Sequence, residues 1–421
     1  MGEGTPVRSS GVGVRGLAMG VHRFLKKWLF FYRPWTVFWA FYFGPWTWSF
    51  RFLSILIPKN PRLVLFGSNE GRLYSDNSRA LFEHIARESD ILKPVWITRS
   101  KDIVSEVEVE FPGMAVKSPS LKAAAIYLRA KQVVFCHSFL DMCYMPRIPG
   151  KFENCLWHSI PLKKIGFFRP ASKHRERTFT RWCSGVNRVF VASEYEEEMM
   201  RIAFGEDGID FVISGNPRND WLYDNSKAAS EGFEDTRTIL YAPTYRIAGD
   251  DGAVPNHHIL HPSLSEKDIH EFLIENDARL IVRPHWIRGE VGFASERMES
   301  VPQTEEPDLF RLFEKADVFV TDYSGGFFDW LILDRPVVFS AYDLDEYEEQ
   351  VGFVQDYSEF ASGPICKTAI EVLDAIKEGL DEPEKFSDLR RAQANRFLGD
   401  SAGGASGKIM KILEDEASSR M

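Results

Sequence analysis

The chain has 421 residues, of which 44% are hydrophobic and 27% are charged, so it is long enough to form two or three ordinary domains with substantial cores. This composition excludes a small disulfide scaffold and a disordered tail. The formal net charge of −10 argues against a general nucleic-acid binder, because binding along a phosphate backbone needs a surplus of Lys and Arg. We therefore expect no nucleic-acid partner.

The charge is divided unevenly along the chain. Before Pro61, eight Lys and Arg residues stand against one acid, so this head carries +7 and the remainder carries −17. Residues 24–57 contain five of the eleven tryptophans and no acid. The longest uncharged run, 34–50, falls short of the roughly 20 residues that a spanning helix needs, and two prolines interrupt it.

A basic, aromatic segment of this kind favours binding in the plane of an anionic membrane surface. A transmembrane segment and an arm that packs on its own domain are the alternatives. We assign the membrane-associating segment to residues 21–60 and predict that residues 1–20, rich in Gly, Ser and Val, are disordered.

The cysteines are five in number and show neither a C-x-x-C pair nor the spacing of metal ligands. This pattern predicts buried free thiols in a reducing cytosol, and no metal site. The residues are Cys136, Cys143, Cys155, Cys183 and Cys366.

Beyond residue 60, short β-branched runs alternate with amphipathic helical stretches, which is the pattern of βαβ units and a parallel sheet. In the first half, the expected strands are 62–67, 93–98, 132–137, 152–158, 188–193 and 211–215. The expected helices there include 78–88, 120–130 and 194–204.

A polar stretch over residues 223–237 predicts a linker, after which the pattern restarts. The expected strands of the second half are 238–243, 279–284, 317–322 and 336–341, with helices near 268–275, 308–315 and 327–333. We therefore predict an α/β fold of two Rossmann-like domains, residues 61–222 and 238–395, facing each other across a cleft, with a C-terminal helix in 396–421. Ligands of such sheets lie beyond the carboxyl ends of the strands.

The most informative strand end is at Asp322, where a Ser324-Gly325-Gly326 turn opens a helix. The glycines and the free N–H groups of a helix start favour a phosphate or pyrophosphate site. Asp329, about one turn into the helix, is placed to accept hydrogen bonds from ribose hydroxyls. The alternative is that Ser324 only caps the helix and that Asp329 is only a favourable charge at its start.

Two further strand ends of the second half carry cations and hydroxyls. Arg283 and His285 follow one strand, and Thr244 and Arg246 follow another. Such groups bind phosphate oxygens and stabilise charge on a departing nucleotide. We predict that they converge with the Ser-Gly-Gly turn on one anionic ligand, although a histidine in a loop is often a bystander.

In the first half, a predicted strand ends at His158, and Lys163 and Lys164 follow it closely. Histidine has a suitable pKa to take a proton from a hydroxyl at neutral pH, so we predict that His158 is a general base for phosphoryl transfer. The alternative is a structural histidine at the sheet edge. His137 has no convergent partner in the sequence, and motifs of dehydrogenases, P-loop NTPases, serine hydrolases and zincins are missing.

In this combination and order, the strand-end residues resemble the CDP-glycerol glycerophosphotransferase family, the membrane-associated enzymes that prime and polymerise teichoic acids. The matching segments are 66–81, 156–167, 191–205, 213–220, 239–246, 282–285, 320–347 and 363–368.

The resemblance implies the GT-B architecture and a reaction. In that reaction, glycerol phosphate or ribitol phosphate passes from CDP-glycerol or CDP-ribitol to a lipid-linked polyol-phosphate or glycan acceptor, and CMP is released. No cofactor beyond the donor is implied, and the place of action is the cytoplasmic face of the cell membrane. A nucleotide-sugar glycosyltransferase and an inactive membrane adaptor of the same fold are the alternatives.

The resemblance also implies roles for single residues. The implied functional histidines are His158 and His285; the implied nucleotide and phosphate contacts are Thr244, Arg246, Arg283, Asp322, Ser324, Gly325, Gly326 and Asp329; and the implied acceptor side includes Ser68, Lys163 and Lys164.

Two places depart from the family pattern. The usual Trp-His-Gly-Thr reads Trp-His-Ser159-Ile160 here, and the usual Asp-Tyr-Ser-Ser ends in Gly325. We expect the first change to add bulk beside the base, which bears on the choice of polyol or acceptor. We expect the second to remove one hydroxyl contact with phosphate.

Overall fold

The computed structural model describes residues 47–169, 179–180, 183, 185–205, 208–226, 236–244, 259–284, 292–399 and 403–419. The chain divides into two compact units. The smaller comprises Met1–Pro58 with Pro146–Pro149, and the larger comprises Lys59–Met145 with Gly150–Met421.

The smaller unit contains a helix over residues 47–56. Large apolar side chains lie on its solvent-exposed surface, where Trp48 is 72% exposed and Ile55 is 77% exposed. Within the described ranges, no helix has the length and apolar character needed to cross a membrane. The predicted disordered tail, 1–20, and most of the predicted membrane-associating segment lie outside the described residues.

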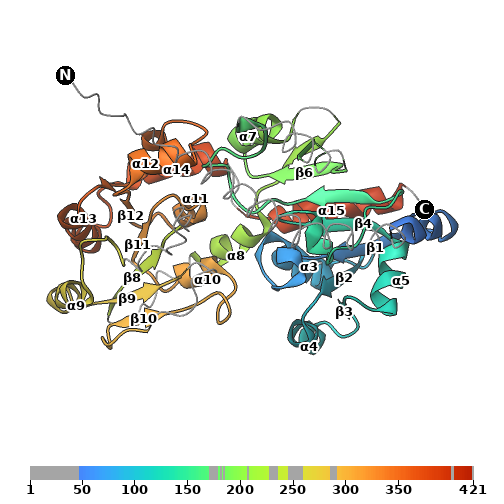
Figure 1. The fold of residues 1–421 in the computed structure, drawn as a ribbon, viewed down its shortest axis with the longest axis horizontal. Helices are drawn as coiled ribbons and strands as arrows, with labels where there is room; N and C mark the ends of the chain where they lie inside the picture. The colour runs from blue at the N-terminus through green and yellow to red at the C-terminus, as the bar shows by residue number, and fades with distance from the viewer. Residues whose placement is uncertain are drawn as a thin grey trace, which may run out of the picture. The chain divides into compact units, whose positions relative to one another are not determined.

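The larger unit contains two parallel β-sheets, each flanked by helices (Figure 1). The first sheet has seven strands in the order β3-β2-β1-β4-β5-β6-β7, so the strand order reverses between β1 and β4. Its strands are β1 (Asn60–Phe66), β2 (Lys93–Thr98), β3 (Ala115–Lys117), β4 (Ala130–Phe135), β5 (Phe152–Cys155), β6 (Arg188–Val191) and β7 (Asp210–Ile213).

The helices of this first domain include several that begin at a serine. Ser100, Ser120 and Ser193 each accept hydrogen bonds from backbone N–H groups of the first turn, which stabilises the start of α4, α5 and α7. The helical segments are η1 (Asn69–Gly71), α3 (Asp76–Glu88), α4 (Lys101–Glu110), α5 (Leu121–Arg129), η2 (Phe139–Met142), η3 (Gly166–Phe168), α7 (Glu194–Phe204) and α8 (Pro217–Ser226).

The second sheet has six strands in the order β10-β9-β8-β11-β12-β13, again with a reversal beside the first strand of the domain. The strands are β8 (Arg237–Ala242), β9 (Ala278–Val282), β10 (Met298–Ser300), β11 (Val318–Thr321), β12 (Val337–Ser340) and β13 (Ile365–Cys366). The helical segments are α9 (Glu266–Glu275), α10 (Leu309–Phe313), α11 (Gly326–Trp330), η4 (Leu331–Leu333), α12 (Leu344–Gln350), η5 (Tyr357–Glu359), α13 (Ala369–Asp381), α14 (Ser387–Leu398) and α15 (Ala405–Ser418).

The predicted α/β fold with parallel sheets is confirmed, with differences at element ends. The strand predicted over 152–158 ends at Cys155, so Trp157 and His158 lie in the following loop. The predicted linker, 223–237, begins inside α8, which continues to Ser226. Three edge strands, β3, β10 and β13, were not predicted, because two or three residues give no readable periodicity.

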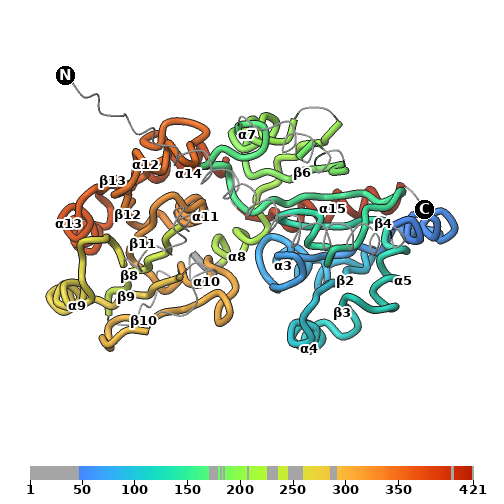
Figure 2. Tube along the Cα trace, in the orientation of Figure 1, coloured from blue at the N-terminus to red at the C-terminus, as the bar shows by residue number. Residues whose placement is uncertain are grey.

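The C-terminal helix α15 packs on the first domain, not on the second, which precedes it in the chain. Figure 2 shows the trace returning to run beside β1 and β4. Ile409 and Leu413 are fully buried in the core of the first domain, and the Gln132 side chain donates a hydrogen bond to the Leu413 carbonyl at 2.9 Å. The first domain is therefore completed by the last helix of the chain.

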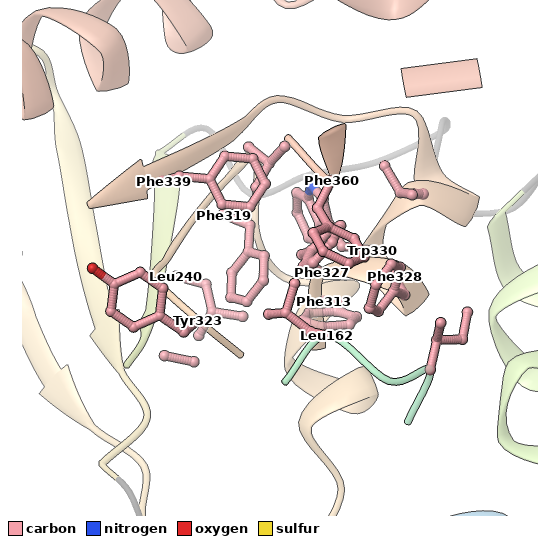
Figure 3. Packing of buried hydrophobic residues seen from close by; sticks show 14 of the residues in the cluster. Leu162, Leu240, Phe313, Phe319, Tyr323, Phe327, Phe328, Trp330, Phe339 and Phe360 are labelled. Atoms are coloured by element: carbon pink, nitrogen blue, oxygen red, sulfur yellow. The ribbon is translucent and has the colours of Figure 1, made fainter. Parts of the chain in front are cut away.

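The core of the second domain is rich in aromatic side chains, among them Phe313, Phe319 and Trp330 (Figure 3). Two residues of the loop that carries His158 belong to the same cluster, since Ile160 is 2% exposed and Leu162 is 3% exposed. Burying such side chains stabilises by about 1.5–3 kcal/mol each. The loop after β5 is thus anchored in the second domain. All five cysteines are free and buried, as predicted.

Candidate functional site

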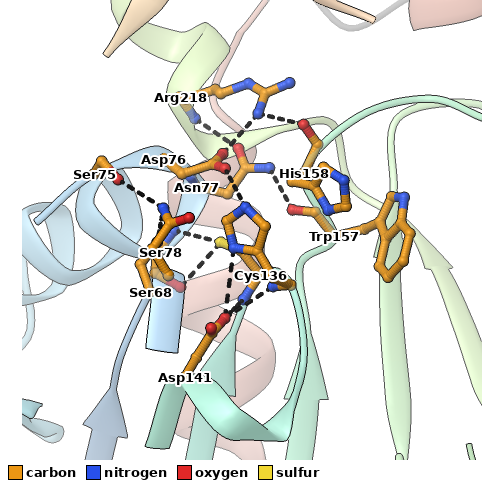
Figure 4. Close-up of polar contacts among 12 residues, drawn as sticks. Ser68, Ser75, Asp76, Asn77, Ser78, Cys136, Asp141, Trp157, His158 and Arg218 are labelled. Carbon is orange, nitrogen blue, oxygen red and sulfur yellow. Dashed lines mark hydrogen bonds and ion pairs between the residues drawn. The ribbon is translucent and has the colours of Figure 1, made fainter. Parts of the chain in front are cut away.

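The site is built at the carboxyl ends of β4 and β5, beside the start of α3 (Figure 4). Trp157 and His158 follow β5, and His137 stands two residues beyond the end of β4. The strand order reverses between β1 and β4, and ligands of doubly wound sheets bind beside such a reversal.

Side chains from two other elements fix the backbone of the loop that carries His158. Trp157 has a φ of 50°, a left-handed conformation that costs a non-glycine residue free energy. Its carbonyl accepts a hydrogen bond from the Asn77 side chain at 3.0 Å, and the His158 carbonyl accepts one from Arg218 at 2.6 Å (Figure 4). These bonds hold the strained turn, and with it the position of His158.

The imidazole of His158 contacts two other rings. It stacks on His137 with centroids 4.6 Å apart and 15° between the planes, and its centroid is 4.5 Å from that of Trp157. Burial and then the neighbouring His137 lower the pKa of His158 to about 3, while Asp76 opposes this. His158 is therefore neutral at physiological pH, the form that accepts a proton.

His137 is held between two carboxylates. Its Nε2 is 3.8 Å from Oδ2 of Asp76, and its Nδ1 is 3.6 Å from Oδ2 of Asp141. Burial alone lowers the pKa of His137, but the carboxylates of Asp141 and Asp76 outweigh burial and raise that pKa above its ordinary value. Asp141 is fully buried and also accepts the backbone N–H of His137 at 2.8 Å. A histidine whose pKa is raised thus lies against the neutral ring of His158.

Arg218, in the first turn of α8, joins this cluster to the second domain. Its guanidinium contacts Oδ1 of Asp76 at 2.6 Å and Oδ2 of Asp329 at 2.8 Å. Asp329 lies in α11, where the sequence placed it, and is 6% exposed. Burial raises the pKa of Asp329, and Arg218 opposes this rise.

The ends of β8 and β11 meet in the second domain. Oδ1 of Asp322 accepts the backbone N–H of Thr244 at 2.8 Å and that of Tyr323 at 2.5 Å. The Ser324 hydroxyl accepts the N–H of Gly326 at 3.3 Å, a contact at the start of α11. The structure therefore brings Thr244, Asp322 and the Ser-Gly-Gly turn to one edge of the sheet, as the sequence predicted.

Arg283 also follows a strand of this sheet, β9, but it is 8% exposed. Its guanidinium donates hydrogen bonds to the carbonyls of Val301 at 3.2 Å and Pro307 at 3.1 Å, and burial lowers its pKa to about 10. The other two predicted cationic residues, His285 and Arg246, lie outside the described residues.

The residues predicted for the acceptor side occupy two places. Ser68 is fully buried directly after β1. Lys163 forms an antiparallel bridge with Phe353, and the backbone N–H of Lys164 donates to the Gly352 carbonyl at 3.0 Å. The two lysines therefore belong to a backbone pairing between the His158 loop and the second domain.

The two departures from the family pattern lie in contact with each other. A Cβ atom at position 325 would overlap the hydroxyl group of Ser159. Ile160, the second residue of the first departure, packs into the core of the second domain, so the expectation that its bulk lies beside the base is corrected. The contact between Ser159 and Gly325 places the residue next to His158 against the start of α11.

Several residues of the site were not found from the sequence: His137, Asp76, Asn77, Asp141 and Arg218. Their side chains come from separate elements and converge only in the folded chain. His137 had a usable signal, because it ends a strand predicted over 132–137 and strand ends hold ligands in such sheets. Among the described residues, no group of three or more His, Cys, Asp or Glu side chains is arranged to hold a metal ion.

The chain matches a protein-family model over residues 49–415, and that family is described as CDP-Glycerol:Poly(glycerophosphate) glycerophosphotransferase. The match includes every described residue of the site.

Two bacterial relatives and one solved structure agree with this match. The chain is 28% identical to the teichoic acid poly(glycerol phosphate) polymerase of Bacillus spizizenii over 348 residues, which cover 78% of this chain and 86% of that one. It is 27% identical to the teichoic acid glycerol-phosphate transferase of Staphylococcus aureus, with 87% and 95% covered. The fold is that of the wall teichoic acid polymerase TagF, with a TM-score of 0.70 at 24% identity over 86% of this chain and 91% of that one.

Proposed function

Because the chain belongs to the CDP-glycerol:poly(glycerophosphate) glycerophosphotransferase family, we propose that it transfers glycerol phosphate from CDP-glycerol to a hydroxyl of a membrane-linked acceptor in the synthesis of a teichoic-acid-like polymer. CDP-ribitol is the alternative donor. The observation that carries the proposal is the contact between Ser159 and Gly325, which sets the neutral His158 beside the predicted phosphate-binding turn.

In the proposed reaction, the acceptor oxygen attacks the β-phosphorus of the donor and a new O–P bond forms. The bond from that phosphorus to the bridging oxygen breaks, and CMP leaves with the electron pair. His158 takes the proton of the acceptor hydroxyl. Positioned bases of this kind contribute roughly a hundredfold to ten-thousandfold in rate.

In this proposal, residues of the second domain stabilise the negative charge on the diphosphate. We propose that Ser324, Gly325 and Gly326 present the start of α11 to the phosphates, and that Arg246 and His285 supply cationic contacts. The donor and the acceptor are the substrates, and no metal or other cofactor takes part in the reaction as proposed.

Two predicted contacts are limited by bonds already present. Arg283 donates to two backbone carbonyls, so a phosphate contact must use its remaining N–H groups. Asp329 is paired with Arg218, so a ribose contact needs a carboxylate oxygen that Arg218 leaves open. The hydrogen bond from the backbone N–H of Thr244 to the Asp322 carboxylate holds the two strand ends together.

We further propose that the two domains have the GT-B arrangement and that the acceptor binds on the side of Ser68, Lys163 and Lys164. The basic head would hold the acidic body at the cytoplasmic face of the membrane, where a lipid-linked acceptor is found. The +7 charge before Pro61 and the exposed apolar residues of the helix over 47–56 support this placement.

A donor panel tests the proposed function. The purified full chain is incubated with CDP-glycerol, CDP-ribitol or a UDP-sugar, together with a lipid-linked glycerol phosphate acceptor in vesicles. We expect CMP release and an acceptor mass gain of one or more glycerol phosphate units with CDP-glycerol. UDP release with the sugar donor and no CMP release would point to the glycosyltransferase alternative. Nucleotide binding without any turnover would point to the adaptor.

A further inference from the structure

His137 stands at the end of β4, where the strand order of the first sheet reverses. Its ring stacks on that of His158, 4.6 Å away and nearly parallel. Neither the family resemblance nor the proposed reaction gives this residue a role. This half-buried histidine is in direct ring contact with the proposed base, so it bears on both the position and the pKa of His158.

We propose that His137 is a positioning residue for the transfer step, which holds the imidazole of His158 in place by stacking and is itself held by Asp76 and Asp141. This inference rests on the proposed function of His158 as the base. It differs from a carboxylate–histidine pair, because the carboxylates contact His137 and not His158.

The orientation of His158 depends on this stacking. Among the described residues, Nδ1 of His158 is buried and has no hydrogen-bond partner, so no carboxylate fixes the ring. Arg218 bonds the carbonyl of His158 and Asn77 bonds that of Trp157, so the backbone is fixed, but the side chain can still rotate about its own bonds. The ring of His137 on one face limits that rotation.

The pKa values of the two rings are also shifted in opposite directions. The charged and titratable groups around them are Asp76 on α3, Arg218 on α8, Asp141 in η2 and Cys136 after β4. Burial raises the pKa of the Cys136 thiol, so it is neutral. The two carboxylates raise the pKa of His137, while burial and the neighbouring His137 lower the pKa of His158.

His137 is poorly placed to be the base itself. Its Nε2 and Nδ1 face Asp76 and Asp141 at 3.8 Å and 3.6 Å, so both ring nitrogens are directed at the carboxylates. The division of roles is therefore one histidine, His158, that reacts and a second, His137, that supports it. The negative charge of a bound donor favours the protonated form of His158, so the proton is accepted when the substrate is present.

The test compares His137→Phe, which keeps a flat ring but removes the titratable nitrogens, with His137→Asn, which removes both. His270→Phe is the matched control, because His270 lies on α9 of the second domain and bonds Ser295 at 2.7 Å, away from the cluster. NMR titration of histidine rings in isotope-labelled full-length protein, assigned with His158→Gln, reports the protonation of His158 without any substrate.

In wild type, we expect His158 to remain neutral down to the lowest pH at which the protein is folded, and the ring of His137 to titrate above the ordinary histidine range. In His137→Phe, the titration of His158 should move up by about one pH unit or more, and the acidic limb of kcat/KM should move with it. In His137→Asn, kcat should also fall because the ring is no longer held, while KM for the donor changes little. His270→Phe should leave both readouts unchanged.

Two results would overturn the proposal: a His158 that titrates near 6.5 in the folded wild type, or one whose titration in both His137 variants is the same as in wild type. The wild-type measurement stands even if a variant does not fold. Because the titration needs no turnover, failure of every donor to release CMP would contradict the proposed function while leaving the titration to decide the role of His137.

Discussion

At the scale of single residues, the environment of His158 separates it from a histidine in water. Its folded-state pKa lies near 3, against about 6.5 in an unfolded chain. Between these two values the unfolded chain binds a proton that the folded chain does not, so the contribution of His158 to stability falls as the pH drops below 6.5.

This linkage gives a prediction that does not depend on activity. When the pH is lowered from 7.5 to 5, wild type should lose unfolding free energy because of His158. The His158→Gln variant should lose about 1–2 kcal/mol less than wild type does. Urea unfolding at the two pH values measures the difference. If wild type and His158→Gln lose the same unfolding free energy, His158 is solvated and ordinary. His270→Gln, at a histidine outside the site, is the control.

Arg218 provides a second residue-scale prediction. Its positive charge neutralises the carboxylates of Asp76 and Asp329, both largely buried. Arg218→Met therefore leaves these two carboxylates without their cation. We expect a loss of about 3–5 kcal/mol in unfolding free energy. The control is Lys377→Met, which breaks an exposed pair with Asp381 and should cost less than about 1 kcal/mol. Similar costs for the two variants would contradict the role given to Arg218.

At the scale of elements, the sequence predicted most strands and the edge at which the site forms. Parallel strands buried on both faces are β-branched runs that can be read locally. The loop after β5 could not be read in this way. Its apolar residues Ile160 and Leu162 give no sign, in sequence, that they pack in the other domain, and Arg218 gives no sign that it pairs with Asp329.

The contact between this loop and the start of α11 gives an element-scale prediction. Gly325→Ser should collide with the Ser159 hydroxyl and separate the two elements, at a cost of about 1–3 kcal/mol that appears as a loss in kcat/KM. Ser159→Gly alone opens a space, and Ser159→Gly with Gly325→Ser should recover most of the activity.

A double-mutant cycle in kcat/KM and melting temperature measures this coupling. Gly292→Ser is the matched control, because a Cβ atom there meets nothing within 4 Å. If the effects of the two substitutions simply add, positions 159 and 325 are not coupled and the account of the two family departures is wrong.

At the scale of the whole molecule, the chain builds one domain from both of its ends. The core of the first domain is completed by α15, which comes after all six strands of the second sheet in the sequence. Sequence reasoning assigned a C-terminal helix but not its place, because an amphipathic helix shows which of its faces is buried and not which core receives it.

This crossover predicts that the last helix stabilises the first domain. Leu413→Ala removes a fully buried side chain from that core and should cost about 2–5 kcal/mol of unfolding free energy. Ile370→Ala, at a position 73% exposed, is the control and should change stability by less than about 0.5 kcal/mol. Urea unfolding followed by tryptophan fluorescence reports the loss; equal effects of the two variants would place α15 elsewhere.

We propose that His158, a neutral histidine held by a loop that bridges two domains, accepts a proton while glycerol phosphate is transferred. The most direct test is the rate of CMP release from CDP-glycerol, with a lipid-linked glycerol phosphate acceptor, by wild type and by His158→Asn shown to be folded. The account predicts CMP release matched by acceptor elongation in wild type, and a rate lower by on the order of a hundredfold or more in the variant. A folded His158→Asn that releases CMP at the wild-type rate would contradict it.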